Sequence, residues 1–117
     1  MSVELDDLRR ERRKFTEQSV IVRFHDKSNN NVIRTLKCSS QDISAGGLKL
    51  VSRTPLALGL KVPMEIDLGS MWAVIEVLAE IKWCLEVDEM PTYYVGIKLI
   101  DIQQSNLQVW KKFIEKL

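Results

Sequence analysis

Histidine, cysteine and proline are scarce in this chain of 117 residues, which holds one histidine, two cysteines and three prolines. A single histidine, His25, excludes a histidine-rich metal site and any catalysis that needs two histidines. Cys38 and Cys84 lie inside apolar, strand-like runs and not in a metal-ligand spacing, so we expect two buried thiols in a reducing compartment. With no nucleophile–histidine pairing and no glycine-rich phosphate loop leading into a helix, we expect neither an enzyme nor a cofactor site.

Long apolar runs are also missing. No stretch approaches the ~20 consecutive apolar residues that a membrane-spanning helix needs. The N-terminus is polar and charged, which does not fit a secretory signal. The sequence therefore predicts a cytoplasmic protein without a membrane partner.

Charge is unevenly distributed along the chain. Residues 9–14 carry five positive charges and one negative charge, a net of +4, which leaves −3 for the rest of a chain whose net charge is +1. A compact basic segment on a mildly acidic body favours a local anion site over the broad basic face that duplex DNA requires. Spare aromatic residues are too few for single-stranded nucleic acid, so we expect no DNA or RNA partner.

Most of the chain reads as short strands. Six segments alternate between apolar and polar residues with a period of two, and turn-rich sequence separates them, at residues 19–25, 32–40, 48–53, 62–68, 75–85 and 93–101. No helices are interleaved, which predicts an all-β fold, either an antiparallel barrel or a closed sandwich. A C-terminal helix follows: Ser105-Asn106-Leu107-Gln108 fits a capping box, and Leu107, Trp110, Ile114 and Leu117 recur at helical spacing.

The aromatic residues and one glycine can be placed on these elements. Trp83 and Trp110 lie on the apolar faces of their strand and helix, which predicts core or helix-docking positions. Trp72, beside the turn at residues 69–70, is expected to be the exposed tryptophan, and His25 to be a surface residue beside a turn. Gly96 inside a strand predicts a bulge or a close backbone approach.

The stretch Gln41–Leu48 has more polar groups than a turn requires. Gly46 and Gly47 allow positive φ and close approach of the backbone to a ligand, and Asp42 and Ser44 can bond neighbouring amides or a ligand. Taken alone, the stretch fits an ordinary hairpin turn whose polar side chains serve only their own loop. The arginines upstream change the balance, because guanidinium binds phosphate and guanine edges.

Together these residues resemble a known family. Arg9 and Arg13, with Arg10 and Arg12 between them, precede a strand, a loop and then residues 42–47, an order similar to the RxxxR and (D/N)xSxxG pattern of PilZ domains. The stretches at residues 81–83 and 94–99 resemble the same family. The resemblance implies a six-stranded antiparallel β-barrel with a C-terminal helix over residues 19–117, preceded by an N-terminal segment, residues 1–18, with an arginine-rich switch loop.

The resemblance also implies a function. PilZ domains are receptors for the bacterial second messenger cyclic di-GMP, which changes their surface and so signals to a protein partner. The ligand-binding residues that it implies are Arg9, Arg10, Arg13, Asp42, Ser44, Gly46 and Gly47. The arginine segment would fold onto the barrel when ligand binds.

Two alternatives stay open on the sequence alone. In a second register the family's arginine pair falls on Arg13 and Glu17, which puts a carboxylate where phosphate should bind. Such a domain would be an adaptor that works through protein contacts without the nucleotide, and an exposed apolar patch around Trp72 would favour it. Either a monomer or a homodimer is compatible with a small barrel that has open strand edges.

Overall fold

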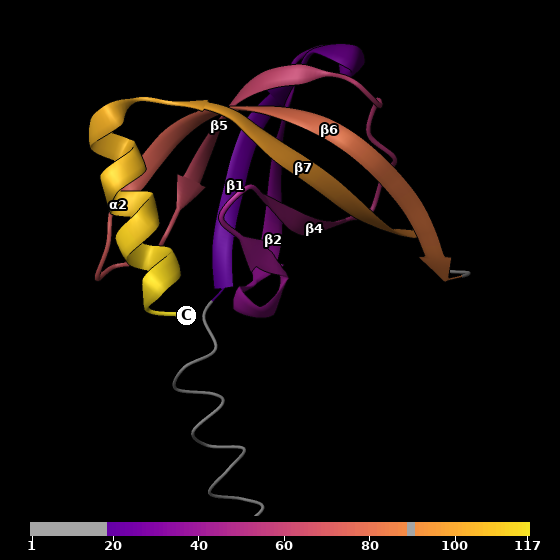
Figure 1. The fold of residues 1–117 in the computed structure, drawn as a ribbon. Coiled ribbons are helices and arrows are strands. Elements are labelled where there is room, and N and C mark those ends of the chain that lie inside the picture. The colour runs from indigo at the N-terminus through magenta and orange to yellow at the C-terminus, as the bar shows by residue number, and fades with distance from the viewer. Residues whose placement is uncertain (1–18, 89–90) are drawn as a thin grey trace, which may run out of the picture.

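The computed structural model describes residues 19–88 and 91–117. These residues form seven strands, two short 3-10 helices and one α-helix (Figure 1). In chain order they are β1 (Ser19–Asp26), η1 (Lys27–Asn29), β2 (Val32–Ser39), η2 (Ser40–Asp42), β3 (Ile43–Ser44), β4 (Gly47–Ser52), β5 (Lys61–Asp67), β6 (Val74–Asp88), β7 (Thr92–Ile102) and α2 (Gln104–Glu115).

Six of the strands close into a barrel. Their order is β2-β1-β5-β6-β7-β4, every neighbouring pair is antiparallel, and the bridge between Lys37 of β2 and Val51 of β4 joins the two ends. The two-residue strand β3 is added beside β4 and was not predicted. The predicted fold, a six-stranded antiparallel barrel with a C-terminal helix, is confirmed.

The strands alternate because one face lines the barrel interior. In β5, for example, Val62, Met64 and Ile66 are buried and the residues between them are exposed or half-buried. Asn30 and Asn31 turn the chain between β1 and β2 with positive φ, a backbone conformation that asparagine tolerates. Both cysteines are free; Cys38 is buried as predicted, whereas Cys84 is only half-buried.

Strand β6 departs from its predicted face. The register of β6 against β7 shifts between Ile81 and Trp83, so that Ile81 is opposite Ile97 but Trp83 is opposite Gly96. An extra residue reverses which side chains point inward. Ile81 is fully buried, but Trp83 is 44% exposed and Leu85 is 58% exposed. The prediction of a core position for Trp83 is wrong. Apolar residues still alternate in the sequence after the bulge, but the extra residue turns their side chains from the barrel interior to its outer face.

Helix α2 covers one end of the barrel (Figure 1). Its buried side chains are Trp110 and Phe113, whose rings stack with centroids 6.2 Å apart. Trp72 meets the Phe113 ring edge-on at 5.5 Å and is half-buried, so its predicted exposure is wrong. Trp72 is partly buried because Phe113 of helix α2 packs against it. This contact cannot be predicted from the residues next to Trp72 in the sequence.

The predicted capping box is also absent. The helix begins one residue before Ser105, and its N-cap is Gln103, which makes no side-chain capping bond. The backbone instead starts the helix directly, with the Leu107 amide bonded to the Gln103 carbonyl at 2.8 Å. Across the described ranges, 19–88 and 91–117, the structure contains no helix with the length and apolar character to span a membrane.

We predict that Phe113→Ala lowers the free energy of unfolding by about 3–5 kcal/mol, because it leaves a cavity between two tryptophans. Urea denaturation measures this change. Leu117→Ala, at a side chain that is 42% exposed on the same C-terminal segment, is the control and should change stability by less than about 0.5 kcal/mol. Equal losses for the two variants would contradict the docking role of Phe113.

Candidate functional site

The polar stretch connects β2 to β4 at the outside of the barrel. Ser40–Asp42 form η2, Ile43–Ser44 form β3, and β4 starts at Gly47, which pairs with Lys98 of β7. Ser39 caps η2, since its side chain accepts a hydrogen bond from the Gln41 amide at 3.3 Å. We call residues 42–47 the motif loop.

The absence of a side chain has a different structural effect at each of the two glycines of the motif loop. Neither of them has positive φ: among the described glycines only Gly59 and Gly69 have it, so that part of the prediction is wrong. A Cβ on Gly47 would collide with the backbone carbonyl of Ile97 on β7, whereas a Cβ on Gly46 would meet nothing within 4 Å. Gly47 therefore allows close approach of two strands, and Gly46 leaves the loop surface open.

The polar side chains of the motif loop have partners in the barrel wall. Asp42 forms an ion pair with Lys49, Oδ1 to Nζ, at 3.3 Å. The same ammonium lies 4.5 Å from the centroid of the Tyr94 ring. Ser44 donates from Oγ to the Gly47 carbonyl at 3.3 Å. Both side chains of the ion pair are about a third exposed, so Asp42 stays accessible to a ligand.

The inner side of the motif loop is fixed to the rest of the fold. The Ala45 carbonyl accepts a hydrogen bond from the Trp110 indole nitrogen at 3.1 Å, and the Gly46 carbonyl accepts one from the Leu99 amide at 2.9 Å. The Cys38 thiol donates to the Asp42 carbonyl at 3.7 Å. Burial raises the pKa of Cys38 to about 12, so it remains a neutral thiol beneath the loop.

A shallow hollow of about 290 Å³ lies in front of the motif loop. We call it the loop hollow. Its lining combines the loop with the outer faces of three strands: Asp42, Ser44, Gly46, Gly47, Leu48, Lys49, Lys82, Trp83, Gly96, Ile97 and Lys98. Three lysines and one exposed tryptophan thus share a surface with the carboxylate and hydroxyl of the loop.

Trp83 reaches the loop hollow because of the bulge in β6. Its indole lies over Gly96, where any side chain would overlap the ring. A bulge or a close backbone approach was predicted at Gly96; the register shift lies opposite it on β6, and the group that approaches Gly96 closely is the Trp83 side chain. The sequence interpretation missed Trp83 and the lysines; Gly96, which is opposite Trp83 on one side and Lys49 on the other, was the signal available for those two residues.

The predicted site residues divide into two groups. Asp42, Ser44, Gly46 and Gly47 line one hollow, as expected of a common site. Arg9, Arg10 and Arg13 lie outside the described residues. Within the part of the chain that the structure describes, no three His, Cys, Asp or Glu side chains gather to hold a metal ion.

The family follows from a comparison with known domains. Residues 7–116 match the PilZ domain. The chain belongs to the PilZ domain family. Curated proteins gave no match. Among solved structures, the "PilZ domain with c-di-GMP of YcgR from Escherichia coli" superposes with a TM-score of 0.63 at 14% identity, over 85% of this chain and 81% of that one.

A second solved structure, K. pneumonia MrkH, superposes with a TM-score of 0.57 at 21% identity. The match covers 85% of this chain but only 42% of MrkH. Identities this low establish a shared fold. The PilZ barrel is thus common to all three chains, and the binding properties of this one have to be argued from its own residues.

We predict that the two motif glycines differ sharply in stability experiments on this PilZ domain. Gly47→Ala should lower the free energy of unfolding by about 1–3 kcal/mol, because the new methyl group forces β4 and β7 apart. Gly46→Ala should be neutral or should stabilise by about 0.4–1 kcal/mol, since it restricts the unfolded chain without a clash. Denaturant midpoints measure both changes. A stable Gly47→Ala protein would show that the approach of β4 to β7 is not tight.

Proposed function

We propose that this PilZ domain is a non-enzymatic receptor that binds cyclic di-GMP in the loop hollow. The observation that carries the proposal is that the motif residues Asp42 and Ser44 face the same hollow as Trp83 and three lysines. A cyclic dinucleotide has flat guanines and two phosphates, and this lining offers partners for both. The likeness to a YcgR domain solved with c-di-GMP supports the same ligand.

The guanine would be held by Asp42 and Trp83. Guanine's Watson–Crick edge carries N–H donors, which a carboxylate accepts, and its face stacks on an exposed aromatic ring. Trp83 is 44% exposed and its indole lies over Gly96, so the ring is accessible beside the motif loop. Asp42 would exchange its partner Lys49 for the base, and the freed ammonium would lie beside the ligand.

The phosphates would be held by cations. Lys98 is exposed, and Lys82 makes an ion pair with Glu80 at 3.6 Å with about half of its own side chain exposed. Lysine is a point charge, whereas arginine binds phosphate in bidentate fashion. The loop hollow has a volume of about 290 Å³, near the small end of the range for ligand pockets. We propose that Arg9, Arg10 and Arg13, in the N-terminal segment 1–18, complete the site and cover it.

We further propose that the bound state acts on a protein partner in the cytoplasm, where two free thiols would persist. An alternative function is protein binding without the nucleotide. The outer face of β4, β7 and β6 favours it, because Val51 and Leu85, which flank Tyr94 across the sheet, are 41% and 58% exposed. Capture of the same partner with and without nucleotide would support this alternative.

We predict that Asp42→Asn weakens cyclic di-GMP binding by more than about tenfold, because hydrogen bonds to a charged group are roughly twice as strong as those between neutral groups. Isothermal titration calorimetry on the full chain measures the dissociation constant. Asp101→Asn, at an exposed residue outside the loop hollow, is the matched control and should bind as the wild type does.

Thermal unfolding of the same proteins checks that the fold is intact. The Asp42 ion pair is partly exposed and should contribute no more than about 1 kcal/mol, so the midpoint should change little. Absence of heat from the wild type at tens of micromolar protein, with the barrel folded, would refute the proposed function.

The arginine register is settled by a second pair of variants. If Arg9 and Arg13 are the phosphate pair, Arg9→Ala should weaken binding by about tenfold or more, and Glu17→Arg should change it little. If the pair falls on Arg13 and Glu17, Arg9→Ala should be nearly silent and Glu17→Arg should strengthen binding, since it replaces a carboxylate with a guanidinium. Calorimetry with the same nucleotide distinguishes the two patterns.

A further inference from the structure

Strands β1 and β5 are paired along only part of their length. Arg23 is opposite Glu65 at the end of the ladder. Continued by two residues, the register would set His25 opposite Pro63, which has no N–H to donate. On its other side each strand remains fully paired: β1 pairs with β2 as far as Asp26, and β5 pairs with β6 as far as Lys61. The barrel wall therefore opens between β1 and β5.

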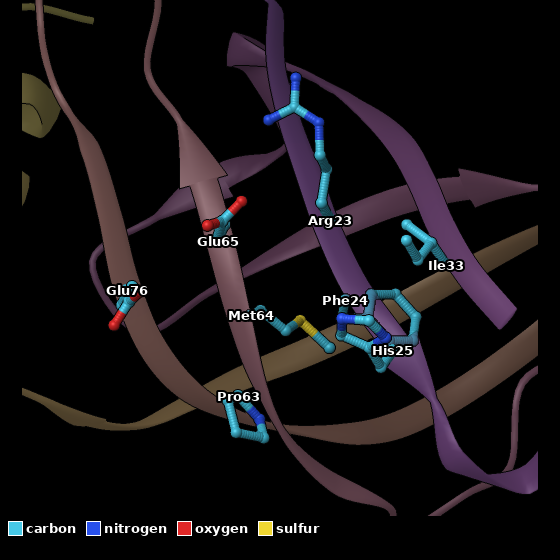
Figure 2. A pocket seen from close by; sticks show the side chains of 8 residues that line it. All are labelled: Arg23, Phe24, His25, Ile33, Pro63, Met64, Glu65 and Glu76. Atoms are coloured by element: carbon cyan, nitrogen blue, oxygen red, sulfur yellow. The ribbon is translucent and has the colours of Figure 1, made fainter. Parts of the chain in front are cut away.

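A hollow of about 340 Å³ lies at this opening. We call it the β1–β5 hollow (Figure 2). Its lining is mainly apolar at the base and charged at the rim: Phe24, Ile33, Pro63, Met64, Arg23, His25, Glu65 and Glu76. Phe24 and Met64 belong to the core, with 3% and 2% exposure, whereas Ile33 is 61% exposed. A ligand that covered Ile33 would remove apolar surface from water.

The rim of the β1–β5 hollow carries unbalanced negative charge. Glu65 and Glu76 are directly opposite each other on β5 and β6, and like charges in such positions repel. Neither carboxylate takes part in an ion pair between residues that the structure describes. The nearby cation Arg23 is paired instead with Asp67, at 3.8 Å.

The charged and apolar parts lie side by side. Figure 2 shows Glu65 and Glu76 to one side of Met64, with Phe24 and Ile33 on the other. A ligand long enough to span Met64 would therefore meet a carboxylate pair at one end and apolar side chains at the other. The volume of about 340 Å³ lies near the small end of the range for small-molecule sites, which suits a small ligand.

We propose that the β1–β5 hollow binds a small organic amine. Its ammonium group lies between Glu65 and Glu76 and relieves their mutual repulsion, while its aromatic or branched aliphatic body covers Met64 and Ile33. The site shares no residue with the loop hollow. It is therefore independent of the cyclic di-GMP proposal, and the two can fail separately.

Phenethylamine is a suitable probe, with 2-phenylethanol as its uncharged counterpart. In proton–nitrogen NMR spectra of the full chain, the amine should shift signals of His25, Ile33, Met64, Glu65 and Glu76 and leave the motif loop unchanged. The alcohol should bind about two- to fivefold more weakly, as expected for loss of one partly exposed ion pair. Equal affinities for the two probes, or shifts spread over every acidic surface residue, would overturn the proposal.

The double variant Glu65→Gln/Glu76→Gln tests the carboxylates directly. It should weaken phenethylamine binding by about two- to fivefold and leave 2-phenylethanol binding unchanged. Glu115→Gln, an exposed residue on α2, is the control and should bind the amine as the wild type does. Full retention of amine binding by the double variant would refute the site.

Two further measurements on the double variant separate loss of the site from loss of the fold. Its thermal midpoint should equal or exceed that of the wild type, because a repulsive pair has been removed. Its affinity for cyclic di-GMP should be unchanged. An unfolded variant would contradict the proposed repulsion between Glu65 and Glu76, and weakened nucleotide binding would contradict the independence of the two hollows.

Discussion

Two positions without side chains, Gly47 on β4 and Gly96 on β7, set the shape of the loop hollow. Gly47 lets β4 approach the Ile97 carbonyl, and Gly96 leaves the space that the Trp83 indole fills. The register links the two, because Gly96 is opposite Lys49 and Gly47 is opposite Lys98. Each glycine thus has a lysine as its cross-strand neighbour, and the floor of the hollow is backbone flanked by cations. Larger residues at these positions would fill the surface on which a flat ligand can lie.

The motif loop connects this surface to the barrel end. Asp42 and Ser44 face the hollow, while the Ala45 carbonyl is bonded to Trp110 on α2. Trp110 in turn stacks on Phe113, which is fully buried. If a ligand displaced the loop, the hydrogen bond between Trp110 and the Ala45 carbonyl would either oppose the movement or pass it on to the helix. This contact joins the motif loop of the proposed receptor to the packed side chains at the barrel end.

The sequence predicted the parts of the fold that depend on regular alternation. Six strands were placed within a few residues, because burial of one barrel face imposes a period of two. What failed were features set by tertiary contacts. The apolar pattern through Ile81, Trp83 and Leu85 is the same with or without a bulge, so it could not reveal that Trp83 turns outward. The sequence predicted an exposed Trp72, because its contact with Phe113 forms only when the helix packs on the barrel.

The net charge of +1 conceals a division of charge over the barrel itself. The long strand β6 carries Glu76 near its start and Lys82 beyond its middle. Glu76 is opposite Glu65 of the neighbouring strand β5, whereas Lys82 lines the loop hollow with Lys49 and Lys98. One strand therefore supplies a carboxylate to the rim of the β1–β5 hollow and an ammonium group to the loop hollow. The opposite charges of the two proposed ligands correspond to this order of charges along β6, which the net charge of the whole chain does not show.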